Sequence, residues 1–172
     1  MRTPRAGRGE QPDSAAMRLF RRQWASGVTI VLARDGEGFR GATVASFSIV
    51  SLEPPLVLVC VENDARTAQL VAETGGFTVS ILEGRHEITA DRFAGRGPAV
   101  DAALSGVPHA LAPSGCPVLG QSLAWFDCRT TAVHDGGDHR IIVGAVLAAG
   151  FGETSDDPLL FFDGRYRSLN PA

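Results

Sequence analysis

The sequence predicts a mainly β protein with a few short helices, whose strands form one antiparallel barrel. About seven short segments are rich in β-branched and apolar residues and are bounded by Gly, Pro or Asp-Gly turns, which is typical of strands joined by hairpins. The regular βαβ alternation of a Rossmann domain is missing. The 20 Gly and 10 Pro among 172 residues provide the frequent turns that many short strands need.

The first half of the chain predicts one helix and then a close succession of strands. Residues 13–24 form the expected helix, because bulky and Arg side chains fall on opposite sides of a helical period. The Asp-Gly-Glu-Gly sequence at 35–38 has the composition of a hairpin turn. Pro54 and Pro55 end one strand, and the apolar run after them is typical of a fully buried central strand. The strands expected here are 28–32, 39–46, 48–52, 56–61 and 77–82.

The second half predicts two short helices and a final meander of strands. The helices are expected at 67–73 and 87–93, with Gly75 as the stop signal of the first. The segment 99–107 fits a helix or a loop. The meander is expected to consist of a strand at 123–133, a turn at 135–138, a strand at 140–149 and a closing strand at 159–162, followed by a tail at 164–167.

The chain is expected to hold one domain over residues 13–170, preceded by a disordered leader at 1–12. The leader contains Arg, Gly and Pro but lacks the apolar region of a signal peptide. No apolar stretch reaches the roughly 20 residues that cross a bilayer, so no membrane partner is expected. The three cysteines have no CxxC spacing, which favours reduced thiols in a cytoplasmic protein; they are Cys60, Cys116 and Cys128.

Charge and motif content exclude several classes of function. The net charge of −3 leaves no basic surplus for nucleic acid. All 16 basic residues are Arg, which excludes a Lys nucleophile, Schiff-base chemistry and a Walker-type phosphate loop. A serine hydrolase is not expected, because no GxSxG elbow occurs. His134, Asp138 and His139 lack the spacing of a recognised ligand set, so no metal is expected.

The first candidate site is the segment 43–48, Thr-Val-Ala-Ser-Phe-Ser. Small side chains at Ala45 and Ser46 let backbone amides approach a flat ring closely, and the hydroxyls of Thr43 and Ser46 add hydrogen-bonding groups. The alternative is an ordinary strand with small residues at a tight barrel bend. The chemistry of the segment alone leaves both interpretations open.

The second candidate is the polar turn Asp64-Ala65-Arg66-Thr67 at an expected helix start. Free N–H groups, a hydroxyl and a guanidinium together favour a phosphate. The alternative makes Asp64 an ordinary N-cap and Arg66 a solvated surface residue.

The third candidate is Gly137-Asp138-His139, where a turn meets a long strand. A His beside an Asp at such a turn is either a surface feature or a group that orients a ligand.

Together these segments resemble the flavin reductase family of FMN-binding split barrels, the small partners of two-component flavin monooxygenases. The run SFSIVSLEPPL at 46–56 is similar to the family's "SF-x-x-VSL-x-PPL". The Gly-Asp-His turn, the sequence RFAG at 92–95 and the closing GRYR at 164–167 resemble further family elements. The resemblance covers about residues 20–169, nearly the whole expected domain.

The resemblance implies an antiparallel split β-barrel of the FMN-binding type that reduces FMN or FAD with NADH or NADPH. It implies a homodimer, and a separate flavin-dependent monooxygenase that receives the reduced flavin. It gives Arg66 and Thr67 to the flavin phosphate and His139 to the nicotinamide. The cofactor-binding residues that it implies are Thr43, Val44, Ala45, Ser46, Phe47, Val61, Asn63, Arg66, Thr67, Phe93, His139 and Tyr166. It implies no catalytic side chain.

Several points stay open. Phe93 is expected near the flavin or in the barrel core, and Tyr166 over a ligand ring or in a dimer interface. Ala42 and Ala45 stand where many family members have a bulky residue or a second Ser, and the lost hydroxyl either weakens flavin binding in favour of release or reflects neighbouring packing. Ala65 stands where Ser is frequent in the family. Two other functions compete with the reductase: a flavin-binding protein without reductase turnover, and a self-contained oxidase of the pyridoxamine-phosphate oxidase type.

Overall fold

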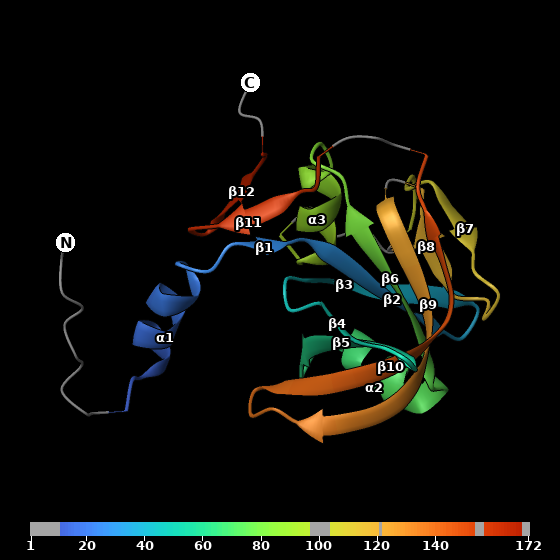
Figure 1. Cartoon of the computed structure of the whole chain (residues 1–172), viewed down its shortest axis with the longest axis horizontal. Helices are drawn as coiled ribbons and strands as arrows, with labels where there is room; N and C mark the ends of the chain where they lie inside the picture. The colour runs from blue at the N-terminus through green and yellow to red at the C-terminus, as the bar shows by residue number, and fades with distance from the viewer. Residues whose placement is uncertain (1–10, 97–103, 121, 154–156, 170–172) are drawn as a thin grey trace.

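The computed structural model describes residues 11–96, 104–120, 122–153 and 157–169 (Figure 1). This part of the chain is built mainly of antiparallel strands, as the sequence predicts. The main sheet has seven strands, which lie in the order β3 (Gly38–Val44), β2 (Thr29–Asp35), β6 (Gly76–Leu82), β9 (Ser122–Asp135), β10 (His139–Phe151), β5 (Pro55–Glu62) and β4 (Ser48–Leu52). A smaller sheet joins β1 (Ser26–Gly27), β11 (Leu160–Phe162) and β12 (Arg165–Arg167), and a third pairs β7 (His109–Leu111) with β8 (Pro117–Leu119).

Two hairpins that the sequence predicts set the register of the main sheet. In the first, Asp35 of β2 pairs with Gly38 of β3, and Gly36 adopts a φ of 59° that a residue with a side chain rarely takes. In the second, Arg140 of β10 pairs with Asp135 of β9, and Gly137 in the turn has a φ of 83°. The two long strands β9 and β10 then run beside each other through two register shifts.

The expectation of a fully buried strand after Pro55 is wrong. In β5, Val57, Val59 and Val61 are buried, whereas the residues between them are only half-buried. The reason is that β5 lies next to the edge strand β4, so one face meets the core and the other is only partly covered. The apolar run therefore offers a second, accessible face.

The three helices of the described residues begin and end near the predicted positions. Helix α1 (Ser14–Arg21) is capped by Asp13, whose carboxylate accepts a hydrogen bond from the Ala16 amide at 2.8 Å. It ends earlier than predicted, because the chain tightens into i to i+3 bonds from Gln23 and Trp24. The other helices are α2 (Arg66–Thr74), which ends at Gly75 in the left-handed conformation as expected, and α3 (Glu87–Phe93).

The buried apolar side chains form two clusters. The first surrounds Phe77 and includes Val59, Leu70 and Ile142, so it joins α2 to the sheet. The second contains Ile30, Leu32, Leu82, Phe93 and Leu159 and lies under α3 and the small sheet. This division determines which candidate residues can lie near one another.

Some predictions fall on short or undescribed segments. The strands β1, β7, β8 and β12 have only two or three residues, too few to produce an alternating pattern in the sequence. Residues 1–10 of the expected leader and residues 99–103 of the ambiguous segment 99–107 lie outside the described residues. Of the helices that the structure describes, none has the length and apolar character needed to span a membrane.

Candidate functional site

The segment 45–47, between β3 and β4, lies against the end of β5. Two hydrogen bonds hold this segment against β5: the Ser46 hydroxyl donates to the Cys60 carbonyl at 2.9 Å and accepts from the Cys60 amide at 3.0 Å. Ala45 and Ser46 are exposed, Val44 is buried, and Phe47 packs at a tilt against Phe126 with ring centroids 5.5 Å apart. Because the one hydroxyl proton of Ser46 is used within the protein, a ligand here would meet the exposed backbone rather than that proton.

Asn63 and His139 meet at one corner of the sheet, although 76 positions separate them in the sequence. The Asn63 side-chain amide donates to the Gly137 carbonyl at 2.7 Å, and its backbone N–H donates to the Asp138 carbonyl at 3.0 Å. The Nδ1 atom of His139 lies 2.6 Å from the Asp138 carboxylate, whose pKa is lowered by this contact. The His139 ring is thereby held in one orientation and stays partly exposed.

Arg66 opens α2 immediately after this corner. Ala65 occupies the N-cap position without a side-chain hydrogen bond, so the alternative with Asp64 as the cap is wrong. The helix N-terminus therefore keeps uncapped N–H groups, which favour an anion. Thr67 is buried against the barrel, whereas the Arg66 side chain is about half exposed.

Arg66 is already paired with protein groups. Its Nη2 lies 3.3 Å from Oδ1 of Asp35, in the β2–β3 hairpin, and its Nη1 lies 3.4 Å from Oε1 of Glu73, two turns along α2. Nη1 also donates to the Gln69 side chain at 3.3 Å. The sequence marks Asp35 only as a turn residue and gives no local signal of its contact with Arg66.

Three of the predicted residues belong to a second group around α3. The Thr43 hydroxyl donates to the Ala90 carbonyl at 2.6 Å and so joins β3 to α3. Phe93 is 8% exposed and packs in the second core cluster, as one of its two expected roles requires. The Tyr166 hydroxyl donates to the Asp91 carboxylate at 3.0 Å, and its ring meets Phe161 edge-on. The structure therefore brings Ser46, Asn63, Arg66 and His139 to the β5 end, and Thr43, Phe93 and Tyr166 to α3.

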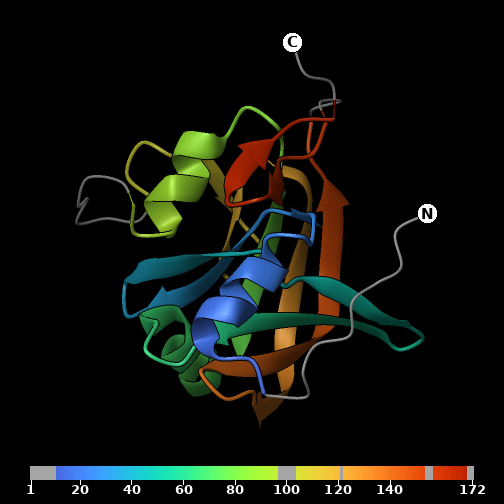
Figure 2. The same cartoon turned by 90° about the vertical axis from the view of Figure 1, so that its left-hand side faces the viewer.

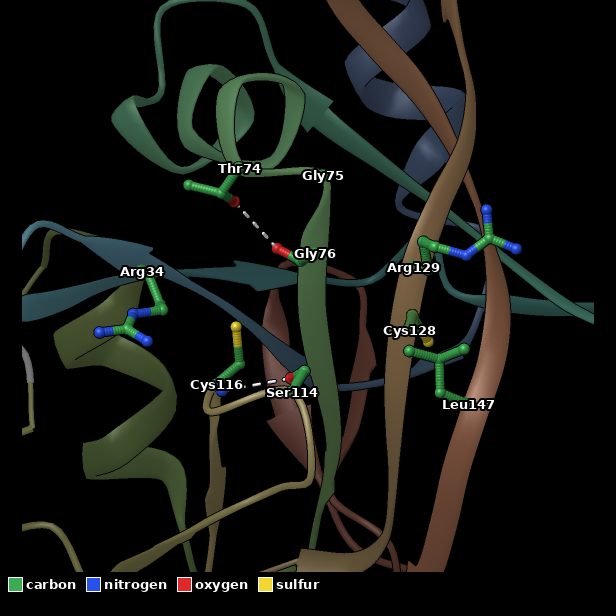
Figure 3. A pocket seen from close by; sticks show the side chains of 9 residues that line it. All are labelled: Arg34, Thr74, Gly75, Gly76, Ser114, Cys116, Cys128, Arg129 and Leu147. Atoms are coloured by element: carbon green, nitrogen blue, oxygen red, sulfur yellow. Dashed lines mark hydrogen bonds between the residues drawn. The ribbon is translucent and has the colours of Figure 1, made fainter.

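A separate pocket of about 200 Å³ lies near the other end of α2 (Figure 3). It shares no residue with the predicted set; its lining consists of Arg34, Thr74, Gly75, Gly76, Ser114, Cys116, Cys128, Arg129 and Leu147. Burial raises the pKa of both thiols, that of Cys128 to about 12. Protonated thiols are poor nucleophiles, so these cysteines serve as small core side chains.

We expect the protein to lose stability in alkaline solution because of Cys128 and Tyr166. Burial raises the Tyr166 pKa from 10.0 to about 12, with the Asp91 hydrogen bond adding to it, and raises that of Cys128 from 9.0 to about 12. In the unfolded chain both groups lose their protons first. Their contribution to the free energy of unfolding is therefore complete below pH 9 and is lost between about pH 9 and pH 12.

Urea denaturation at a series of pH values from 8 to 11 measures this loss, and Cys128→Ala is expected to make the decline start nearer pH 10. Tyr166→Phe is the matched variant and should flatten the upper part of the curve. If both variants decline in parallel with the wild-type protein, the two groups do not cause the loss.

The fold and these contacts define a split β-barrel protein with an exposed backbone segment, a fixed histidine and an arginine at an open helix start. The Flavin reductase like domain matches residues 20–170, so this chain belongs to that family.

Relatives of this chain include reductases of known name. The 4-hydroxyphenylacetate 3-monooxygenase reductase component of Thermus thermophilus is 41% identical over 147 residues, covering 86% of this chain and 91% of that protein. The FMN reductase (NADH) SmoA of Agrobacterium fabrum is 38% identical, covering 83% of this chain and 79% of that protein. The solved structure of the Streptomyces globisporus NADH:FAD oxidoreductase SgcE6 with NAD and FAD fragments is 34% identical, with a TM-score of 0.84 over 92% of this chain and 94% of that one.

Proposed function

We propose that this protein is an NAD(P)H-dependent flavin reductase that reduces FMN or FAD and supplies the reduced flavin to a separate flavin-dependent monooxygenase. The observation that carries the proposal is the joining of Asn63 to the turn before His139 at the end of β5, with Arg66 at the start of the helix that follows and the exposed residues 45–46 against the same end of β5. The named activities of the relatives agree with it, since one is an FMN reductase with NADH and another was solved with NAD and FAD fragments.

The residues present fit a flavin mononucleotide by their chemistry. Arg66 and the uncapped N–H groups before Thr67 suit the phosphate. The exposed residues 45 and 46 with Asn63 suit the edge and face of the ring system, because small exposed residues permit close approach. Val44 and Val61 are buried in the first core cluster, and Thr43 is joined to α3, so these three would support the ring site from behind. We assign the nicotinamide to His139 and leave Phe93 and Tyr166 as residues that support this assembly from α3.

Bound flavin supplies the chemistry by accepting a hydride from the reduced nicotinamide. The protein's contribution is to hold the two rings together and to limit water around them. His139 suits this role, since Asp138 fixes its orientation through the 2.6 Å contact. No side chain of the chain is assigned as a general acid or base.

The first test is the oxidation of NADH and of NADPH, followed by nicotinamide absorbance, with FMN, FAD, riboflavin or no added flavin. Oxidation that depends on added flavin supports a reductase that releases its product, and it reveals both cofactor preferences. Flavin binding without oxidation of either nucleotide would contradict the reductase assignment. It would favour a flavin carrier, or an oxidase whose flavin is reduced by an organic substrate.

We also propose that the protein is a cytoplasmic homodimer. Cys60, Cys116 and Cys128 are free thiols, which suits a reducing compartment. Helix α1 stands outside the barrel and has no buried residue (Figures 1 and 2). At the C-terminal end of α1, Arg22 forms an ion pair with Asp163 at 2.9 Å, which ties the helix to the rest of the chain. A second copy is the partner that would cover this helix.

The apolar side of α1 is the expected contact. Met17 and Phe20 lie three positions apart on one face of the helix, Trp24 follows shortly after the helix ends, and the three side chains are 53%, 64% and 75% exposed. The edge strand β4 also exposes Ile49 and Leu52, and its hairpin with β5 projects from the body (Figure 2). Exposed apolar surfaces of this kind mark interaction sites.

We predict that the double change Phe20→Ser and Trp24→Ser shifts the protein from dimer to monomer. Each aromatic side chain would otherwise bury a large apolar area at the contact, so the dissociation constant should rise by about 100-fold or more. Sedimentation velocity at a series of concentrations measures the shift, with Arg21→Ser as the control on the polar side of the helix. A wild-type protein that sediments as a monomer, or a double variant that stays dimeric, contradicts the proposed contact.

A further inference from the structure

Asp35 bridges two arginines at the place to which the phosphate is assigned. Its Oδ2 lies 3.2 Å from Nε of Arg40, its neighbour in the hairpin, and its Oδ1 lies 3.3 Å from Nη2 of Arg66 at the start of α2. The hydrogen bond from Arg40, together with the contact to Arg66, lowers the Asp35 pKa, so the carboxylate is charged throughout the neutral range. On its other side, Arg66 faces the carboxylate of Glu73 at 3.4 Å.

The charges of this cluster cancel. Arg40 and Arg66 contribute two positive charges, and Asp35 and Glu73 contribute two negative ones. Both terminal nitrogens of Arg66 therefore face carboxylate oxygens in the structure. An incoming phosphate has to share or displace these partners, and it meets two like charges within a few ångströms of its binding group.

Resting on the proposed reductase function, we propose that Asp35 and Glu73 compete with the flavin phosphate for Arg66, keeping flavin affinity low so that reduced flavin is released. A reductase that passes its product to a separate monooxygenase must let the flavin go in each turnover. The two carboxylates lower the affinity for the flavin phosphate by electrostatic repulsion, while Arg66 remains available to bind it.

The opposite role, in which Asp35 orients Arg66 for the phosphate, fits the geometry less well. Charge-assisted N–H···O bonds that fix a guanidinium are typically about 2.7–2.9 Å long. The contacts of Arg66 are 3.3 and 3.4 Å, and its side chain is 47% exposed, so they hold it loosely. Electrostatic repulsion of a phosphate falls off slowly with distance and persists at such separations. Competition is therefore the larger effect.

The test compares Asp35→Asn with Glu37→Gln. Both changes remove one negative charge from the same hairpin, but in the described part of the chain Glu37 forms no ion pair. Fluorescence titration with FMN and with riboflavin, which lacks the phosphate, gives the two dissociation constants. We expect Asp35→Asn to bind FMN about threefold to tenfold more tightly, since exposed charge pairs have effects of this order. Riboflavin affinity should not change, and Glu37→Gln should have a much smaller effect on FMN.

Salt provides a second readout. The gain from Asp35→Asn should shrink in concentrated salt, where the Debye length falls to about 3 Å, while a structural loosening of the hairpin would persist. Glu73→Gln should change FMN affinity in the same direction. Weaker FMN binding by Asp35→Asn, or an equal effect of Asp35→Asn and Glu37→Gln, overturns the competition while leaving the reductase proposal intact. A wild-type protein that binds neither flavin overturns both.

Discussion

Replacing Arg66 by Glu is expected to weaken FMN binding by about 100-fold. A charged hydrogen-bonding partner of a ligand contributes about 1.5–3 kcal/mol, and each 1.4 kcal/mol corresponds to a factor of ten in the dissociation constant. The substitution removes the guanidinium that faces Asp35 and Glu73 and adds a third carboxylate to the same place. Repulsion then acts in addition to the lost contact.

The comparison with riboflavin separates phosphate binding from a general disturbance of the site. Riboflavin lacks the phosphate, so its affinity should hardly depend on Arg66. Arg165→Glu, on the exposed strand β12, is the control for the same change in net charge. If Arg66→Glu leaves FMN affinity intact, the phosphate assignment is wrong, and the exposed guanidinium serves only its surface ion pairs.

The two substitutions in this cluster are expected to change FMN affinity in opposite directions. Arg66→Glu weakens FMN binding and Asp35→Asn strengthens it, although both residues belong to the same ion pair. A purely structural role for the pair would make both variants weaker. The sign of the Asp35 effect is therefore more informative than the size of the Arg66 effect.

The sequence predicts most of the fold because its strands and turns carry local signals. The hairpin turn at Gly36 and the helix end at Gly75 both require a positive φ, which glycine adopts readily, so a glycine between the flanking patterns predicts each of them. The helix expected at 87–93 occurs with those bounds; Ala90 and Phe93 face the second core cluster, whereas Ile88 is exposed. The expectation for β5 failed because burial of a strand's second face depends on which strands lie beside it, and that is not encoded locally.

In the candidate site, too, some features could be predicted from the sequence and others depend on tertiary packing. The resemblance assigned Asn63 and His139 to one site, and the structure joins them through the bond from Asn63 to Gly137. The contact between Asp35 and Arg66 could not be predicted, because 31 positions separate them and α2 packs on β2 only in the folded chain. The partners of Ser46 and Tyr166, namely the Cys60 backbone and Asp91, are likewise products of tertiary packing.

Stability is expected to depend strongly on the contact between Phe77 of β6 and Gly144 of β10. The Phe77 ring is fully buried in the first core cluster. A Cβ atom added to Gly144 would lie 2.6 Å from Cζ of that ring, 2.8 Å from its Cε1 and 3.0 Å from Cβ of Cys128. The aromatic ring therefore occupies the space that a side chain at 144 would need.

Phe77→Ala should lower the free energy of unfolding by about 3–5 kcal/mol, because it leaves a cavity in a closely packed core. Gly144→Ala should lower it by about 1–3 kcal/mol through overpacking. Gly76→Ala is the matched control for adding a Cβ beside Phe77, since that atom would meet only the Cys128 carbonyl oxygen at 3.7 Å, an ordinary contact. Denaturant unfolding measures all three.

Combining Phe77→Ala with Gly144→Val tests whether the two sites share one space. The Val methyl groups would enter the volume that the ring has left. The double variant should therefore be more stable than the summed effects of Phe77→Ala and Gly144→Val, each measured alone, predict. This coupling should amount to about 1–3 kcal/mol, the range for residues that share a cavity. Strict additivity would mean that the backbone at 144 moves away from β6 rather than the side chains filling a common space. In that case the close approach of β10 to Phe77 would not be what requires a glycine at this position.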